Sequence, residues 1–289
     1  MTLEISESRR TQVGEFEVRR ALPRRQRRTV GAWCFVHHMG PVNVSQDRGI
    51  GVAPHPHMGL QTVTWLLAGQ MMHRDSLGSE QVIRPGELNL MTAGHGVAHS
   101  EERTGDYAGP LHAVQLWVAQ PSATRDGAAA FEHHVELPKV DLEGCVATVL
   151  VGELQGATSS ARRDTDHLGI ELDMHGPATV VPLDAGWEHA LVVLAGALLV
   201  DGLVVEPGHL AYLGLGRDEC RLQANEPTRA LLIGGIPFEE PILMWWNFVA
   251  RTQAEITAAY LDWSAAADRF GHVASLLPRI EVAPPLWVR

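Results

Sequence analysis

Cysteine is scarce in this sequence, and long apolar runs are absent from it. Only three cysteines occur among the 289 residues, and no two of them form a Cys-x-x-Cys pair. We therefore expect no disulfide framework, and the composition fits a reducing cytoplasm. No stretch approaches the roughly 20 consecutive apolar residues that a transmembrane helix needs. The first ten residues contain acidic side chains and no apolar segment, so we expect no secretory signal there.

Positive charge is also in short supply. The formal net charge is −11 at pH 7, and so acidic a chain is not expected to bind nucleic acid directly. The segment 19–28 departs from this trend because six of its ten residues are arginine. It can dock an acidic partner or a phosphate backbone, or it can be a solvated edge strand and turn, and we favour the second interpretation. We expect a monomer without a membrane partner, and a protein partner stays open.

The chain is long enough for two domains, and the regular spacing of its turn residues predicts strands. At 289 residues it exceeds a typical single domain, and apolar residues make up 45% of it, enough for substantial cores. Short apolar runs are separated by turns rich in glycine, proline and aspartate; runs include 61–67, 112–118 and 191–194, and turns include 84–87 and 206–209. This spacing predicts an all-β architecture of antiparallel barrels, not a parallel α/β fold.

Two short motifs carry the clearest indication of chemistry. His55-Pro56-His57 and His99-Ser100-Glu101 each place two metal-type ligands at positions i and i+2. Side chains at i and i+2 of an extended strand point to the same face. Two neighbouring strands can therefore direct three imidazoles and one carboxylate into a common cavity. Such a set suits a divalent transition metal with coordination positions left open.

A single His-x-His pair has an ordinary alternative interpretation. The chain contains 15 histidines, and an isolated pair is more often surface or core histidine than a pair of ligands. The second motif changes the balance because it repeats the spacing and adds a carboxylate. We therefore predict one metal site with His55, His57, His99 and Glu101 as its ligands.

An internal repeat predicts two copies of one barrel. Residues 66–69 match residues 193–196 at an offset of 127, and residues 84–88 match residues 206–210 at an offset of 122. Carried through these offsets, the four candidate ligands correspond in the second copy to Pro182, Asp184, Arg221 and Gln223. This set cannot replace three imidazoles and a carboxylate, so we expect the second copy to be metal-free. His189 and His209 lie at other positions of the repeat, and we interpret them as structural.

We place the metal-binding barrel at residues 1–137 and the metal-free barrel at residues 138–289. Small and polar residues at 120–130 are typical of a linker or loop. Between Pro241 and Trp263, apolar and polar residues alternate at a roughly helical period. The pattern predicts a C-terminal helix that packs on a barrel.

Together these motifs resemble the pirin family, whose members are two-barrel proteins of the cupin superfamily. The resemblance covers nearly the whole chain, most strongly residues 17–120. It rests on residues 31–41, 55–57, 62–64, 73–78, 84–87, 91–94, 99–101 and 116–118, and on Phe248-Val249-Ala250, which the resemblance places at the opening of the C-terminal helix.

The resemblance implies an N-terminal barrel that binds one iron and a C-terminal barrel that has lost its metal. Carried over residue by residue, the iron ligands are again His55, His57, His99 and Glu101. Three positions depart from the family pattern, namely Met58 and His95, where pirins usually have arginine, and Gln61, where most have glutamate. None of them removes a ligand, but each alters the polarity around the ligands. We interpret His95 as a turn residue in preference to a catalytic base.

The implied activity is that of an oxidoreductase of the quercetin 2,3-dioxygenase type. Four nitrogen and oxygen ligands leave about two positions open in an octahedral shell, which suits Fe(2+), with Mn, Ni, Co, Cu or Zn as alternatives. A flavonol-like aromatic substrate would bind there with O2, and Glu101 is the candidate to accept the substrate's 3-hydroxyl proton. An apolar wall for the substrate can come from Trp65, Leu67, Met72, Leu90 and Trp117, but for each of them taken singly we favour the alternative interpretation, ordinary barrel core.

Two other functions are consistent with the same motifs. Some pirins are metal-dependent binding proteins, so the chain can instead be a non-enzymatic iron-binding regulator of a transcription factor or metabolic enzyme. A cupin isomerase, which needs no oxygen, is a third possibility. Oxygen consumption with a flavonol separates the first function from both alternatives.

Overall fold

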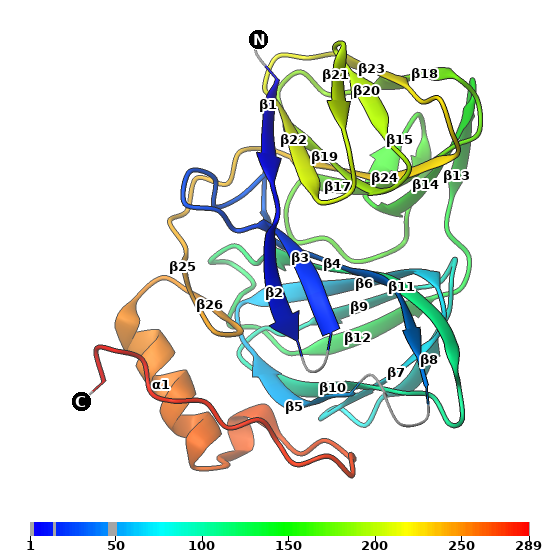
Figure 1. Cartoon of the computed structure of the whole chain (residues 1–289). Helices are drawn as coiled ribbons and strands as arrows, with labels where there is room; N and C mark the ends of the chain where they lie inside the picture. Colours follow the sequence, from blue (N-terminus) through cyan, green and yellow to red (C-terminus); the bar gives the residue numbers. More distant parts are fainter. Residues whose placement is uncertain (1–2, 14–15, 46–50, 289) are drawn as a thin grey trace. The chain divides into compact units, whose positions relative to one another are not determined.

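The computed structural model describes residues 3–13, 16–45 and 51–288, and its regular structure is almost entirely strand (Figure 1). Within these ranges the helices are α1 (Gln253–Ser264) and the short 3-10 helix η1 (Asp268–Phe270). The predicted all-β architecture with a C-terminal helix is confirmed. Neither helix of the described ranges is long and apolar enough to cross a membrane.

Contacts divide the chain into two compact units that interleave along the sequence. Unit 1 comprises residues 1–11, 18–38 and 134–239, and unit 2 comprises residues 12–17, 39–133 and 240–289. The C-terminal helix lies in unit 2, with the strands of the N-terminal barrel, and not with the second barrel as the sequence-based division predicts. The division into domains at residues 1–137 and 138–289 stays a prediction.

Two sheets carry the strands of the N-terminal half. Their orders are β12-β9-β6-β11-β4-β3-β2 and β5-β10-β7-β8. The bounds of the first are β12 (Ala130–His134), β9 (Leu88–Thr92), β6 (Leu60–Ala68), β11 (Gly109–Ala119), β4 (Trp33–Val44), β3 (Phe16–Leu22) and β2 (Arg9–Val13). Those of the second are β5 (Gly51–His57), β10 (Val97–Glu102), β7 (Met71–Asp75) and β8 (Glu80–Ile83). Both sheets contribute to one apolar cluster, which contains Leu66, Leu111, Met71 and Ile83.

Two sheets of the C-terminal half repeat this arrangement. Their orders are β1-β22-β19-β24-β17-β14-β13 and β18-β23-β20-β21. The bounds of the first are β1 (Glu4–Glu7), β22 (His209–Gly214), β19 (Glu188–Ala195), β24 (Thr228–Gly235), β17 (His167–Met174), β14 (Cys145–Val151) and β13 (Lys139–Leu142). Those of the second are β18 (Ala178–Pro182), β23 (Glu219–Gln223), β20 (Leu198–Val200) and β21 (Leu203–Val205). Strands β15 (Glu153–Leu154) and β16 (Ala157–Thr158) form a separate pair.

The strand register confirms the repeat expected from the sequence. Trp65 of β6 lies opposite Leu88 of β9, and the residues matched to them, Val192 of β19 and Leu210 of β22, also lie opposite each other. The side chains inside this second set of sheets are largely apolar. They include Leu172, Val181, Leu191, Val193, Leu198, Val200, Leu222 and Leu232, all buried in one cluster.

The start of the C-terminal helix differs from the sequence-based expectation, and the alternatives for residues 120–130 are resolved in favour of a loop. Phe248-Val249-Ala250 does not open the helix but forms strand β26 (Phe248–Ala250), which pairs with β25 (Leu243–Trp245). The helix begins later because Thr252 caps it, and its side chain accepts a hydrogen bond from the Glu255 backbone N–H. The polar segment at 120–130 is a turn between β11 and β12 and does not link the two barrels.

The arginine-rich segment is not an edge strand. Strand β3, which holds its first arginines, lies between β4 and β2 in the sheet order. Within unit 1, Arg20 Nε donates a hydrogen bond to His37 Nε2 at 2.7 Å. Arg27 lies over the Tyr212 ring, 3.2 Å from its centroid, and pairs with Glu4 at 2.8 Å. Several of these charges are therefore used within the fold.

Gly59 joins β5 to β6 at a point where only glycine fits. Its φ is +71°, and a Cβ at this position would lie 2.1 Å from the Val249 carbonyl oxygen of β26. The neighbouring backbone holds this close approach in place, because the Val249 N–H donates to the Met58 carbonyl at 3.0 Å. Gly78 has a φ of +90° with open space around it, which makes it a matched control.

We predict that Gly59→Ala lowers the free energy of unfolding by at least about 3 kcal/mol, because left-handed strain and a backbone clash add together. Gly78→Ala, which suffers the backbone strain alone, should lose about 1 kcal/mol. Chemical denaturation of both variants measures the difference. Equal losses in the two variants would contradict the proposed close packing of β26 on the Gly59 turn.

Glu240 holds a polar network in unit 2. Its carboxylate accepts hydrogen bonds from the Ser122 hydroxyl at 2.6 Å and from Arg251 at 2.7 Å, and Arg251 also donates to the Gln120 carbonyl at 2.8 Å. Burial tends to raise the pKa of Glu240, but the hydrogen bonds from Ser122 and Arg251 outweigh it and lower the pKa to about 2. The unfolded chain therefore binds a proton at a higher pH than the folded chain does.

We predict that the contribution of Glu240 to stability is fully present above pH 4.5 and is lost as the pH falls toward 2. Glu240→Gln should reduce the difference in unfolding free energy between pH 7 and pH 3. The exposed neighbour Glu239, changed to Gln, serves as the control and should leave that difference unchanged. The same acid sensitivity in wild type and Glu240→Gln would show that this carboxylate is not responsible.

Candidate metal centre

Antiparallel pairing of β5 with β10 brings the two histidine motifs together. The two strands lie side by side (Figure 1). In their register His55 lies opposite His99, and His57 lies opposite Val97. Since side chains alternate along a strand, His55 and His57 share one face of β5. The register shifts between His99 and Glu101, so a local irregularity separates the two candidate ligands of β10.

The three histidines form a tight, buried cluster. Their exposed fractions are 6% for His55, 1% for His57 and 1% for His99. One ring nitrogen of each lies within 4.8 Å of the others, and the Nε2 atoms of His57 and His99 are 3.0 Å apart. The ring centroids are 4.4 to 5.0 Å from one another. Three imidazole nitrogens that converge in this way can hold a divalent metal ion.

The environment of the rings matches what a metal ligand needs. The Nδ1 of His55 lies 2.8 Å from the Ala53 carbonyl oxygen, to which it donates when protonated, and this leaves Nε2 with a lone pair. Burial lowers the pKa of His55 to about 4. Burial, and then the neighbouring histidines, lower the pKa of His57 and of His99 well below the ordinary value. All three are therefore neutral at pH 7, which is the form that binds metal.

Glu101 lies near the cluster but is not one of its converging groups. Burial raises its pKa to about 7, and a hydrogen bond with the Thr64 side chain opposes that rise. In the strand register Glu101 lies opposite His73 of β7. Its role as a fourth ligand stays a prediction. Among the described residues, the ligand atoms that lie within 4.8 Å of one another here belong to His55, His57 and His99 and do not include a Glu101 oxygen.

His73 and Asp75 lie next to the cluster, although the ligand prediction does not include them. His73 Nδ1 lies 3.3 Å from His99 Nδ1, and His73 Nε2 lies 3.0 Å from the Asp75 carboxylate. The His73 ring also stacks on Phe131 at 4.3 Å. Burial alone would raise the pKa of Asp75, but hydrogen bonds from His73 and Ser79 outweigh it and lower that pKa. The signal was present in the sequence, because His73-x-Asp75 repeats the i, i+2 spacing of the ligand motifs.

The three departures from the family pattern occupy different environments. Met58 is 4% exposed, and its sulfur accepts a hydrogen bond from Arg269 at 2.8 Å. Gln61 is buried and donates to the Thr92 hydroxyl at 3.0 Å. The side chain of His95 is exposed in a turn, unlike the buried cluster, which agrees with its interpretation as a turn residue.

Most of the side chains that could have formed an apolar wall point away from the histidines, which agrees with the favoured interpretation that they are barrel core. Thr64 hydrogen-bonds Glu101, so the strand alternation turns Trp65 and Leu67 to the opposite face of β6. Leu90 follows them, because it lies opposite Val63. Met72 likewise alternates with His73. Of the five, Trp117 is the one that contacts the cluster, since its ring packs edge-on against His57 with 5.2 Å between the ring centroids.

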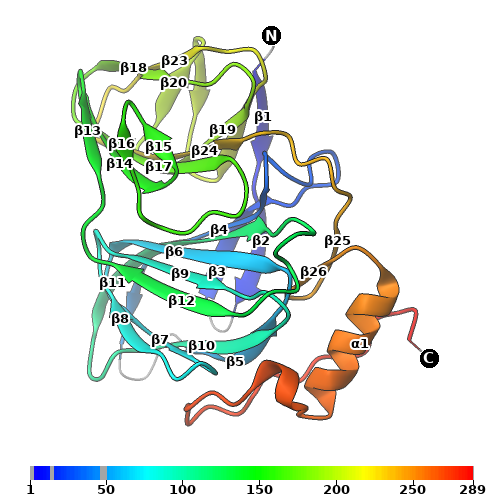
Figure 2. The same cartoon turned by 180° about the vertical axis from the view of Figure 1, so that it is seen from behind.

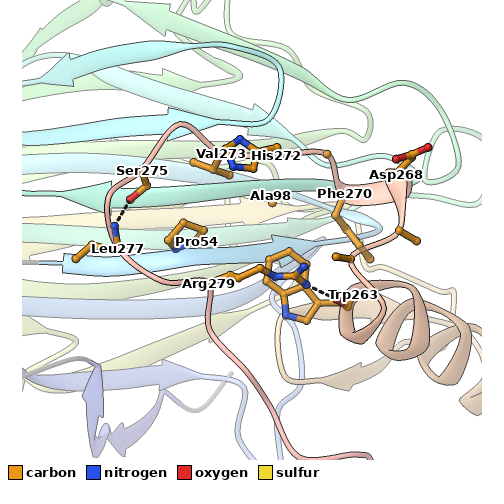
Figure 3. A pocket seen from close by; sticks show the side chains of 13 residues that line it. Pro54, Ala98, Trp263, Asp268, Phe270, His272, Val273, Ser275, Leu277 and Arg279 are labelled. Carbon is orange, nitrogen blue, oxygen red and sulfur yellow. Dashed lines mark hydrogen bonds between the residues drawn. The ribbon is translucent and has the colours of Figure 1, made fainter.

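A separate cavity lies on the other face of the histidine-bearing strands. Its volume is about 270 Å³, and the strands contribute Pro54 and Ala98, the neighbours of His55 and His99 (Figure 3). The alternation of side chains directs these neighbours away from the cluster. The rest of the lining comes from the C-terminal segment, including Trp263, which has the guanidinium of Arg279 3.8 Å above its ring. This cavity is therefore not the metal centre.

The C-terminal segment, which contains α1 and η1, packs on the outer side of β5 and β10 (Figure 2). Phe248, Ile256, Trp263 and Phe270 form one buried cluster with Met58 and Ala98. The Ile280 N–H donates to the Pro54 carbonyl at 2.8 Å. The segment thus supports β5 and β10 from outside while the histidines lie inside.

Comparison with known proteins supports the same family for both halves. The model of the Pirin family matches residues 15–118, and the model of the Pirin C-terminal cupin domain matches residues 169–271. A Pseudomonas aeruginosa protein named "Putative quercetin 2,3-dioxygenase PA1205" is 46% identical over 276 residues, which cover 95% of this chain and 87% of that protein. Human pirin is 33% identical over 231 residues, which cover 76% of this chain and 78% of pirin.

A solved structure agrees with this relationship along the full length. The crystal structure of a quercetin 2,3-dioxygenase from Acinetobacter baumannii superimposes with a TM-score of 0.94 and 41% identity, covering 99% of this chain and 97% of that one. The two sets of sheets are thus two cupin barrels, as the sequence predicted. The chain belongs to the pirin family.

Proposed function

We propose that the chain is a metal-dependent dioxygenase that opens flavonols such as quercetin with O2. The observation that carries the proposal is the buried cluster of three neutral imidazoles at the two ligand motifs. The relatives named as quercetin 2,3-dioxygenases support the choice of substrate class. We assign His55, His57, His99 and Glu101 as ligands of Fe(2+), with Mn, Ni, Co, Cu or Zn as alternative ions.

The donor set fits such an ion. When bound, divalent iron would supply Lewis acidity toward the 3-hydroxyl of the flavonol and the electron chemistry that O2 requires. The protein holds three nitrogen donors in place before the ion binds, because each ring is buried and packed against its neighbours. Four protein ligands would leave about two positions of an octahedral shell for exogenous molecules.

Glu101 is the group that we assign to proton transfer. Burial raises the pKa of this carboxyl group in the metal-free protein, which favours its keeping a proton once the ionised form has accepted one from the 3-hydroxyl. The Thr64 hydroxyl is within hydrogen-bond reach of this carboxyl group and of Gln115 Oε1, the latter at 2.7 Å, and its single proton can be donated to one of the two at a time. Thr64 is therefore the side chain that orients the acid/base group.

We predict that iron-loaded protein consumes O2 in the presence of quercetin and that His57→Ala loses both iron and turnover. His57 is 1% exposed, and its Nε2 atom lies 3.0 Å from His99 Nε2. The substitution therefore removes one of the three converging ligand nitrogens. Elemental analysis and an oxygen electrode measure the two effects. His95→Ala, which changes an exposed turn residue, is the control and should retain both iron and turnover.

The outcomes separate the interpretations. Unchanged metal content in His57→Ala would refute the ligand assignment. Bound metal in the wild type without oxygen uptake over a panel of flavonols would contradict the dioxygenase and would instead support an iron-binding regulator. Turnover that proceeds equally under anaerobic conditions would indicate a reaction that does not use O2.

We predict that Glu101→Gln lowers the rate of quercetin-dependent oxygen uptake by about 10² to 10⁴-fold, because an amide cannot accept the proton. Gln is close to Glu in size and keeps a hydrogen-bonding oxygen for Thr64. Rates normalised to bound iron separate loss of proton transfer from loss of metal. A variant with full iron and the wild-type rate would show that Glu101 is not the base.

A further inference from the structure

We infer that Asp75 and His73 form a relay that fixes the tautomer and the ring orientation of His99, so that the lone pair of His99 Nε2 faces the metal centre. The inference rests on the proposed metal centre but concerns two residues outside its ligand set. Asp75 and His73 would act as positioning residues, since neither belongs to the cluster of converging nitrogens.

The strand register places the relay beside the centre. β7 and β10 are neighbouring antiparallel strands (Figure 1). Asp75 lies opposite His99, and His73 lies opposite Glu101. Residues directly opposite in an antiparallel pair share one face of the sheet. All four side chains therefore point to the same side, and His73 reaches diagonally across to His99.

With His73 as a neutral imidazole, the hydrogen bonds allow one consistent assignment of protons. The Asp75 carboxylate only accepts, so the His73 nitrogen 3.0 Å away, Nε2, carries a proton. A neutral imidazole has one N–H, and so His73 Nδ1 is an acceptor. His99 Nδ1, 3.3 Å from it, must then donate, which leaves His99 Nε2 without a proton. That atom lies 3.0 Å from His57 Nε2, inside the cluster.

The far end of the relay is anchored by backbone groups. The second oxygen of Asp75, Oδ1, accepts the N–H groups of Leu77 and Ser79, each at 2.9 Å. Asp75 is 2% exposed and His73 is 4% exposed, and Phe131 stacks on the His73 ring with an angle of 13° between the planes. The relay is therefore rigid and shielded from water in the absence of a metal ion.

A second ligand shows the same principle with a different partner. His55 Nδ1 is held by the Ala53 carbonyl at 2.8 Å, a backbone group that no substitution removes. For His99 the corresponding partner is a side chain, and the relay can be tested by mutation. Outer partners of this kind fix the tautomer of a metal-bound histidine and raise its basicity, and their loss typically costs 10-fold to 100-fold in metal affinity.

The first test uses the metal-free wild type and needs no variant. The ¹⁵N chemical shifts of the imidazole nitrogens report which nitrogen carries the proton. We expect His99 as the Nδ1–H tautomer and His73 as the Nε2–H tautomer. A His99 that carries its proton on Nε2 would overturn the inference, whatever the metal affinity.

The second test measures binding of Co(II) by titration and by its visible absorption. In Asp75→Asn the amide can keep the bonds from Leu77 and Ser79, but its NH2 donates to His73. The proton of His73 then moves to Nδ1, which drives the proton of His99 to Nε2. We expect Co(II) affinity to fall about 10-fold to 100-fold.

Two further variants complete the design. His73→Phe removes the acceptor for His99 and retains an aromatic ring beside Phe131; we expect it to weaken Co(II) binding about tenfold. His133→Phe is the matched control, because His133 is also a strand histidine, hydrogen-bonded to Asn89 at 2.7 Å, and should leave the affinity unchanged.

The outcomes distinguish the relay from the metal centre itself. A wild type that binds no Co(II), or a His57→Ala variant that binds it as tightly as wild type, would refute the proposed centre. Wild-type affinity in Asp75→Asn, with His57→Ala impaired, would refute the relay alone. Equal loss in His73→Phe and His133→Phe would likewise refute it, because the effect would then be one of general packing.

Discussion

Antiparallel pairing of two short strands, β5 and β10, is the constraint on which the rest of the site depends. The pairing puts His55 opposite His99, and the alternation along β5 puts His57 on the same face. Each histidine alone would be a buried polar group with a desolvation penalty. Three of them together, with their pKa values lowered by burial, form a neutral donor set that a cation can bind.

Packing contacts on both sides of β5 and β10 fix the position of these two strands. On the outside, the C-terminal segment packs Phe270 and Trp263 against the strand backs and meets Pro54 through the Ile280 N–H. On the inside, Asp75 and His73 of the neighbouring strand β7 lie at the edge of the site, and Phe131 of β12 stacks on the His73 ring. Gly59 makes room for β26 directly after the first motif. Rigid ligands lose little entropy when an ion binds, and this rigidity favours a preformed centre.

The sequence predicted the architecture well, because period-2 patterns and a repeat with turns at near-constant spacing are local signals. It predicted the converging histidines for the same reason. It could not decide which side chains share a face across strands: Trp65, Leu67, Met72 and Leu90 could line the pocket or belong to the core, and the register turns them away from the site, in agreement with the core interpretation that we favoured. It also missed His73 and Asp75, since their meaning depends on pairing with β10. The placement of α1 with the N-terminal strands depends on contacts distant in sequence.

The most direct test of the account is an anomalous diffraction map, recorded at the iron absorption edge from crystals of protein reconstituted with Fe(2+). The account predicts a single strong peak in the barrel that contains β5 and β10. The ion at this peak should be coordinated by the Nε2 atoms of His55, His57 and His99, with Glu101 turned toward it and exogenous ligands in the remaining positions. A peak at another position, or an ion enclosed entirely by protein atoms, would contradict it.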